Sequence, residues 1–299
     1  MEDITAKKKV LIITIILNLI IVFSQIGFGI FAKSTALITD AVHNFQDVLS
    51  LVIAFIAAVF AVKKPTSKMT FGYLRAEAMA GFINSAFLVG AIFIVIITAI
   101  EKIIYPETVN SIIVIIVGTI ALIINSISAY ILGFHHHHHE HNHGHTEDLN
   151  IKAAYLHLLS DALISLGVVL GGIIMYFTNI YWIDPILAIL FSLYILKETI
   201  PILKKTFNIL MESVPHGFNL EEIEKEIKSF PEVKEVHDIH IWALSSKDIY
   251  LTAHILLDNQ PLENIEKITQ KIEEKLRKKG INHITIQPET KNFYCKNIY

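Results

Sequence analysis

Two histidine–aspartate pairs with the same spacing stand inside long apolar stretches of the chain. His43 and Asp47 lie in VHNFQDVLSLVIAF, and His157 and Asp161 lie in YLHLLSDALISLGVVL. Residues four apart share one face of a helix, so each pair offers two adjacent metal ligands. Two such half-sites that face each other would supply two imidazoles and two carboxylates. This set suits tetrahedral Zn²⁺, which binds His nitrogen and Asp oxygen.

Charge balance favours a transported ion over a permanently bound one. Two aspartates cancel a divalent cation, which leaves a neutral site that can lie in a low dielectric. Without the metal, the carboxylates would be uncompensated, and histidine is the group for which metal and proton compete near neutral pH. The pairs therefore predict metal transport coupled to proton movement. A single pair could equally be a hydrogen-bonding unit between helices, and Asp40 is expected either to line the path or to pack helices.

The elements that must position these pairs are membrane helices. Hydrophobic residues make up 53% of the 299 residues and charged residues 18%, compared with about 45–50% and 25% in soluble domains. A spanning helix needs about 20 mostly apolar residues. Six segments meet this requirement: 9–32, 36–62, 74–101, 109–134, 150–177 and 180–200. We therefore predict a membrane all-α fold, a six-helix transmembrane bundle that forms domain 1–205.

Lysine and arginine gather in alternate loops. They lie before the first span, between the second and third, at the start of the fifth and at the end of the sixth, whereas the opposite loops offer only Lys33 and Lys102. Cytoplasmic loops carry the excess of positive charge. Both termini and the 2/3 and 4/5 loops are therefore predicted to be cytoplasmic, in a multi-pass protein of the plasma (inner) membrane.

A histidine tract, FHHHHHEHNHGHTED (134–148), occupies the predicted 4/5 loop. Such a composition cannot form a core and is typical of a flexible metal-binding segment. We expect it to raise the local metal concentration at the cytoplasmic mouth. An affinity tag would look similar, but tags stand at termini. The candidate ligands are His135, His136, His137, His138, His139, His141, His143 and His145.

The C-terminal part, 206–299, is predicted to be a small cytoplasmic α+β domain. EEIEKEIKSF and LENIEKITQKIEEKLRKKG have helical periodicity, whereas VKEVHDIHIWAL, DIYLTAHILLD and NHITIQ are typical of strands. The order α-β-β-α-β suits an open-faced sheet with two helices on one side. This domain is expected to bind metal.

Four residues of this domain could gather into a second metal site: His237, His240, His254 and Glu289. His237 and His254 fall on the two paired strands, and Glu289 follows the third strand. His240 fits less well, because an odd separation from His237 points the two side chains to opposite faces of a regular strand. Cys295 is near enough in sequence to add a thiolate. His216 and His283 are interpreted as surface residues.

Taken together, these motifs resemble the cation diffusion facilitator family, in its zinc-transporting branch. The resemblance rests on six spans, HxxxD in spans two and five, the histidine tract, TFGYLRAE (70–77), the DP pair at Asp184-Pro185, and VHDIHIWAL. It implies a V-shaped homodimer with a metallochaperone-like (ferredoxin-like) cytoplasmic domain. It also implies export of divalent metal against protons by alternating access.

The resemblance also assigns residues. His43, Asp47, His157 and Asp161 match the family's transport-site positions, and a histidine at position 43 matches the branch that favours zinc over manganese, iron or cadmium. In the tail, relatives bind zinc at the positions of His237, His254 and Glu289, which makes Zn²⁺ both substrate and expected ligand of the cytoplasmic domain.

Two features of the loop and linker follow from the same resemblance. Met69 and Tyr73 stand where some relatives carry histidines, so no metal site is expected in the 2/3 loop. Arg75 and Glu212 match a charge pair that in relatives locks the two protomers near the membrane surface. A pair of solvated charges is the alternative.

Other classes of protein fit the sequence less well. No HExxH motif of a metalloprotease is present, and a net charge of −3 gives no basic field for nucleic acid. Four strong ligands would bind too tightly for a channel. We therefore predict a secondary transporter rather than an enzyme, a proton-coupled divalent metal efflux protein and most specifically a Zn²⁺/H⁺ antiporter. The alternatives are a membrane-anchored metal sensor or buffer, and efflux of Cd²⁺, Co²⁺, Fe²⁺ or Mn²⁺ rather than zinc.

Overall fold

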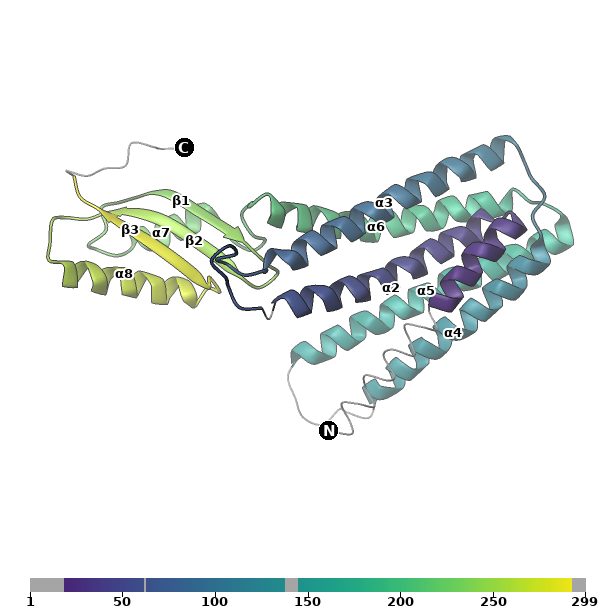
Figure 1. Ribbon diagram of the computed structural model, residues 1–299, viewed down its shortest axis with the longest axis horizontal. Helices are drawn as coiled ribbons and strands as arrows, with labels where there is room; N and C mark the ends of the chain where they lie inside the picture. The colour runs from purple at the N-terminus through teal and green to yellow at the C-terminus, as the bar shows by residue number, and fades with distance from the viewer. Residues whose placement is uncertain (1–18, 62, 138–144, 292–299) are drawn as a thin grey trace. The chain divides into compact units, whose positions relative to one another are not determined.

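The computed structural model describes residues 19–61, 63–137 and 145–291 of the chain (Figure 1). Within these ranges, the side chains of residues 51, 54–58, 61, 128, 129, 131–137, 145–155 and 157 are not described. The chain divides into two compact units. The first comprises Met1–Val52 and Asn84–Ile200, and the second comprises Ile53–Ile83 and Pro201–Tyr299.

Long helices build the first unit and extend into the second. They are a helix over Leu19–Ala32, α2 (Thr35–Ala61), α3 (Arg75–Ile104), α4 (Ser111–His137), α5 (His145–Thr178) and α6 (Ile183–Leu210). Among the described residues, three helices are long and apolar enough to cross a membrane: Arg75–Ile104, Leu158–Thr178 and Ile183–Leu210. The transmembrane helical domain is therefore confirmed, while the count of six spans stays a prediction.

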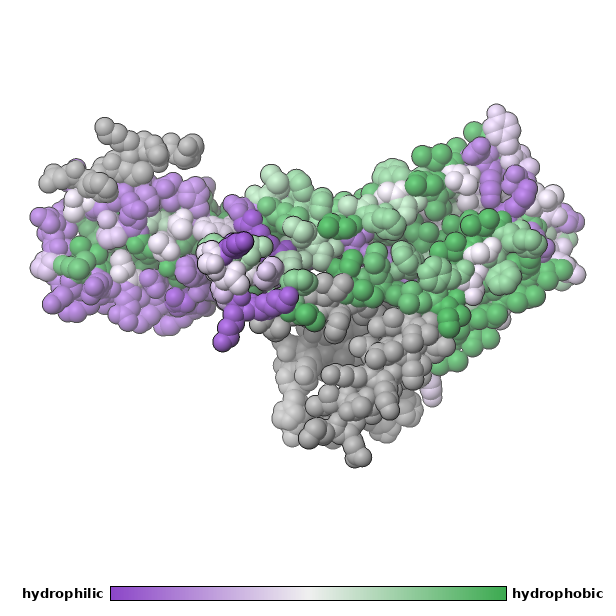
Figure 2. Space-filling model, in the orientation of Figure 1, coloured by the Kyte–Doolittle hydropathy of each residue, from purple (hydrophilic) through white to green (hydrophobic). Residues whose placement is uncertain are grey.

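The surface of these helices agrees with a lipid environment. Large apolar side chains stand exposed along α3 to α6, among them Ile94, Ile97, Leu163 and Leu193. Figure 2 shows hydrophobic residues over much of the visible helical surface, whereas the strand-containing part is mostly hydrophilic. Apolar side chains exposed in this number are costly in water and favourable against lipid tails.

Several helices are longer than the apolar runs that predicted them. α4 continues to His137 and α5 begins at His145, so both helices enter the predicted loop 134–148. α6 continues past Ile200 to Leu210 with Pro201 inside it. An apolar window marks the part of a helix that lies in lipid, and a helix can continue beyond it because its backbone hydrogen bonds do not depend on apolar side chains.

The first turn of α2 is fixed by a carboxylate from α6. Asp184 accepts the Ser34 hydroxyl at 2.5 Å, the Thr35 backbone N–H at 2.6 Å and the Thr35 hydroxyl at 2.7 Å. The Ala36 N–H lies 3.3 Å from the same carboxylate. Ser34 also caps the helix, because its hydroxyl accepts the Leu37 N–H at 3.1 Å. The DP pair of the sequence therefore anchors the helix that carries His43 and Asp47.

We expect Asp184→Ala to destabilise the protein by at least about 2 kcal/mol. The substitution leaves the buried Ser34 and Thr35 donors without their acceptor, and each unsatisfied buried group costs ~1–3 kcal/mol. Thermal unfolding in detergent should show a midpoint lower by roughly 5 °C or more. Glu198→Ala, an exposed position of the same helix, is the control. An equal midpoint for both variants would contradict this role of Asp184.

Close packing joins α4 to α5. A Cβ atom on Gly172 would meet Ile115 Cγ1 at 2.9 Å, and one on Gly118 would meet Val169 Cγ2 at 3.1 Å. Small residues at such contacts let membrane helices approach closely. This packing fixes α5, which carries His157 and Asp161, against its neighbour.

The C-terminal part forms a three-stranded sheet with two helices. In chain order it contains α7 (Leu220–Lys228), β1 (Glu235–Ala243), β2 (Ile249–Leu256), α8 (Leu262–Arg277) and β3 (His283–Glu289). The strand order is β1-β2-β3, with β1 antiparallel and β3 parallel to β2. The predicted order α-β-β-α-β is confirmed.

Both helices of this part pack on the same face of the sheet. Ile227 of α7 and Ile272 of α8 share one core with Leu251, Ala253 and Ile255, which alternate along β2. Side chains of a strand alternate between its two faces. The opposite face, which carries His254, is therefore the one that the two helices leave uncovered.

A β-bulge interrupts β1 at the histidines. His237 pairs with His254 and His240 pairs with Thr252, so three steps along β1 match two along β2. The extra residue, Asp238, has a positive φ of 50°. The extra residue of a bulge shifts the alternation, so that the side chains after it point to the opposite face from the one that a regular strand would give. His240 therefore stands on the same face as His237, and the expectation of opposite faces is wrong.

Candidate metal sites

A buried cluster joins α2 to α5. His43 Nε2 lies 2.9 Å from Asp161 Oδ1, and both side chains are buried. Asp47, one turn further along α2, completes the group, because ligand atoms of the three residues all lie within 4.8 Å of one another. One imidazole and two carboxylates at this spacing could hold a divalent cation.

The start of α2 explains why His43 and Asp161 meet, although they lie at different distances from the ends of their helices. His43 follows the beginning of its helix closely, whereas Asp161 lies far from the end of α5. Leu37, near the start of α2, belongs to the same buried cluster as Val168 and Met175 of α5. These two residues follow Asp161 by roughly two to four helical turns. α2 therefore begins well within the length of α5, so His43 and Asp161 meet.

His157 lies on α5, one turn before Asp161. Its side chain is outside the described part of the structure, so the fourth ligand of the transport site stays a prediction. The i, i+4 relation to Asp161 places both residues on one helix face.

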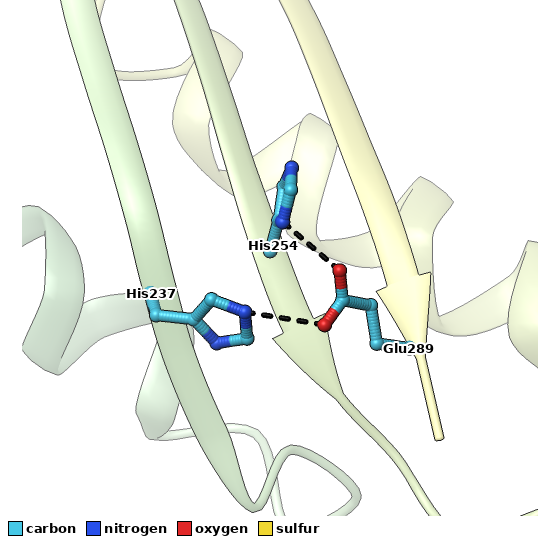
Figure 3. A group of neighbouring side chains, drawn as sticks. All are labelled: His237, His254 and Glu289. Carbon is cyan, nitrogen blue, oxygen red and sulfur yellow. Dashed lines mark ion pairs between the residues drawn. The ribbon is translucent and has the colours of Figure 1, made fainter. Parts of the chain in front are cut away.

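A second cluster lies on the uncovered face of the sheet (Figure 3). His254 Nδ1 is 3.0 Å from Glu289 Oε1, and His237 Nε2 is 3.2 Å from Glu289 Oε2. The two imidazole rings lie 5.4 Å apart at 76°. The Glu289 side chain is fully buried, at 0% exposure. All three ligand atoms lie within 4.8 Å of one another, a set of donors that fits Zn²⁺ with one position left for another ligand.

His240 does not join this cluster, although it was predicted to. Its ring is half exposed and lies 2.9 Å from Asp238 Oδ1. Asp238 Oδ2 in turn lies 3.5 Å from His254 Nε2. The bulge thus brings Asp238 to the edge of the cluster. The sequence pattern did not indicate this aspartate, because a bulge inside an otherwise regular strand leaves no clear signal in the alternation of polar and apolar residues.

The structure describes the Arg75–Glu212 pair fully and the histidine tract only at its two ends. Arg75 and Glu212 form an ion pair within one chain, which leaves their proposed role between protomers a prediction. His135, His136 and His137 belong to the end of α4 and His145 to the start of α5, with side chains outside the description. The rest of the tract, 138–144, and Cys295 also lie outside the described residues.

Two groups of residues could hold a metal ion, one buried between helices and one on the sheet of an α+β domain. Together they indicate a class of membrane protein that handles metal ions. Residues 11–211 match the family model described as the cation efflux transmembrane domain, and residues 215–291 match the cation efflux protein cytoplasmic domain. The chain belongs to the cation efflux family, which confirms the resemblance to cation diffusion facilitators.

Several relatives are similar to this chain over most of their length. The metal cation efflux system protein CzcD of Cupriavidus metallidurans is 36% identical over 89% of this chain and 81% of its own. The cadmium, cobalt and zinc/H⁺-K⁺ antiporter of Bacillus subtilis is 35% identical over 95% and 90%. The proton-coupled zinc antiporter SLC30A8 of Xenopus laevis is 32% identical over 86% and 72%.

We expect Glu289→Gln to weaken zinc binding by the tail cluster by about tenfold or more. The substitution removes the only carboxylate among the three grouped ligands, so the two neutral imidazoles would bind the dication without a negative charge that offsets it. Zinc titration calorimetry in detergent isolates the tail cluster (His237, His254 and Glu289) when Asp161→Ala disables the cluster between α2 and α5 and residues 135–145 of the histidine tract are deleted. His283→Asn alters an exposed histidine of the same strand and is the control. Equal affinities for both variants would remove Glu289 from the site.

Proposed function

We propose that the protein exports divalent metal, with zinc as the main substrate, in exchange for protons. The observation that carries the proposal is the buried contact between His43 and Asp161 with Asp47 in reach. Ionisable groups at membrane depth are costly and mark ion pathways. The antiport named for several relatives supports the same reading.

The geometry suggests how metal and proton exclude each other. His43 Nε2 and Asp161 Oδ1 are 2.9 Å apart, the distance of one shared hydrogen bond. A zinc ion that binds the same two atoms must take the place of that bridging proton, because metal ligands bind in their deprotonated forms. Asp47 and His157 would supply the other two ligands. Metal entry releases a proton from the imidazolium–carboxylate form of this pair, because zinc takes Nε2 and the remaining ring proton stays on Nδ1. Return of a proton to Nε2 in turn favours metal release.

The wider organisation is part of the proposal. We assign residues 1–205 to a six-span transport domain and 206–299 to the cytoplasmic domain, with both termini in the cytoplasm and the protein in the plasma (inner) membrane. The family model of the tail supports a homodimer. The histidine tract would concentrate metal at the cytoplasmic mouth.

The tail cluster could hold a resident zinc ion. His237, His254 and Glu289 are the residues that would bind it, since they offer two imidazole nitrogens and a carboxylate within reach of one ion. Bound zinc would stabilise the end of the sheet, because it links all three strands. A sensor or buffer would use such a site as well, but it would have no use for the ligands buried between α2 and α5.

Metal flux into proteoliposomes tests the function directly. Purified protein in vesicles with an acidic interior should accumulate zinc, and collapse of the pH gradient should stop the accumulation. The same assay with Cd²⁺, Co²⁺, Fe²⁺ and Mn²⁺ ranks the substrates. Zinc binding without any flux in either condition would favour the sensor or buffer instead.

A further inference from the structure

A further carboxylate lies buried beside the membrane cluster. Asp40 is 0% exposed and lies one turn before His43 on α2. The Gln25 amide donates to Asp40 Oδ2 at 2.6 Å. The Ser165 hydroxyl lies 3.3 Å from both carboxylate oxygens. One carboxylate therefore joins the helix over Leu19–Ala32, α2 and α5.

The Asp40 carboxylate accepts hydrogen bonds from two side chains, each of which accepts a hydrogen bond from another residue. Asn44 donates its amide to Gln25 Oε1 at 3.1 Å, which leaves the Gln25 amide nitrogen to donate to Asp40. Asn125 donates to Ser165 Oγ at 3.2 Å, which leaves the Ser165 hydroxyl proton for Asp40. Donors that converge on a carboxylate stabilise its charged form. Among the ion pairs of the described residues, none gives Asp40 a lysine or arginine.

The charge lies next to the metal ligands. Asp40 and His43 are three residues apart on α2, and Asp161 and Ser165 are four apart on α5, so each pair shares a helix face with Cβ atoms about 5–6 Å apart. The contact between Asp40 and Ser165 is therefore the neighbour of the contact between His43 and Asp161. Charges this close in a buried bundle are weakly screened by solvent.

A role in helix packing alone does not explain the residue type. A neutral asparagine would accept hydrogen bonds from Gln25 and Ser165 without the cost of burying a charge. Asp184, the other fully buried aspartate discussed above, accepts backbone N–H groups at a helix N-terminus, whereas Asp40 accepts from the side chains of Gln25 and Ser165. A divalent cation in the adjacent site would offset the cost of burying the Asp40 charge.

We propose that Asp40 is an anionic, non-ligating residue of the transport site, whose charge raises the affinity of that site for a divalent cation. The proposal rests on the transport function proposed above. Its charge makes the site more attractive to a dication than the ligands alone would, and the hydrogen bonds from Gln25 and Ser165 stabilise the charged form of the carboxylate.

The test measures zinc transport by the full-length protein in proteoliposomes. Asp40→Asn removes the charge and keeps an acceptor oxygen. We expect its half-saturating zinc concentration to rise at least about tenfold, with a maximal rate within about threefold of the parent and an unfolding midpoint within a few degrees. Glu198→Gln, which removes a carboxylate at an exposed position of α6, is the control. It should change neither the midpoint nor the half-saturating concentration.

A charge swap separates charge from structure. Asp40→Asn/Ser165→Asp moves the carboxylate across the 3.3 Å contact from α2 to α5. The swap should bring the half-saturating zinc concentration back to within about threefold of the parent. A half-saturating concentration for Asp40→Asn equal to that of the parent would overturn the proposal. Failure of the folded swap variant to recover would also overturn it.

Two further outcomes would also decide the role of Asp40 or the proposed function. If Asp40→Asn cannot be obtained as folded protein, the swap alone decides, and a tenfold or larger rise in its half-saturating concentration refutes the charge role. If the parent itself transports no zinc, the proposed function fails first. If the parent transports zinc and Asp40→Asn matches it, only the inference about Asp40 fails.

Discussion

Asp161→Ala is expected to reduce zinc transport by at least about a hundredfold, which places it among the largest effects that a single substitution can have here. Asp161 contacts His43 across the α2–α5 interface and is one of the two carboxylates in the membrane cluster. Its loss leaves a bound dication with half of its compensating charge in a low dielectric, which is strongly unfavourable. Zinc uptake by proteoliposomes at saturating zinc measures the loss.

The neighbouring residue provides the control for this experiment. Ser160→Ala alters the adjacent position of α5, whose hydroxyl donates to the Leu156 carbonyl at 3.0 Å. This variant should keep normal flux. Both variants should elute from size-exclusion chromatography at the volume of the parent, because Asp161 is one buried contact among many. Zinc flux in Asp161→Ala at the level of Ser160→Ala would exclude Asp161 as a ligand.

Residue spacing predicted the membrane cluster, because i, i+4 pairs fix a helix face whatever the tertiary structure. His43, Asp47 and Asp161 come together as two such pairs would require. Their depth was harder to predict. Flanking charges locate the ends of apolar runs, but the depth at which α2 begins depends on the Asp184 carboxylate from α6. That contact spans most of the chain and leaves no local pattern in the sequence.

In the tail domain, too, local sequence patterns predicted the elements but not the contacts between residues far apart in the chain. Period-two alternation predicted the strands of the domain and their order. It failed at Asp238, where the inserted residue changes the face of His240 and places a carboxylate beside His254. Buried polar networks such as the one around Asp40 are equally hard to foresee, because their members come from four separate helices and each is an ordinary polar residue in its own segment.

His43→Asp is expected to change which metal the protein transports, with cadmium gaining about tenfold or more relative to zinc. His43 contributes the only imidazole nitrogen that the structure describes in the membrane cluster. Imidazole is a borderline ligand that suits zinc, whereas a carboxylate is a harder ligand that accepts a wider range of divalent ions. The buried position next to Asp161 means that a new carboxylate would contact the ion directly rather than through solvent.

Two comparisons separate ligand type from other effects of this substitution. His43→Asn removes the imidazole without adding charge, so it should lower the transport of both metals without favouring cadmium. His216→Asp makes the same exchange at an exposed histidine of the tail and should leave the ratio of cadmium to zinc transport unchanged.

The ratio of cadmium to zinc uptake is measured in proteoliposomes at matched free metal concentrations. Because both metals share one site and one path, the ratio is insensitive to the amount of protein that is correctly inserted. A ratio for His43→Asp equal to that of His216→Asp would mean that the residue at position 43 does not select the metal, and selectivity would then have to come from Asp47, Asp161 and the geometry of the helices that carry them.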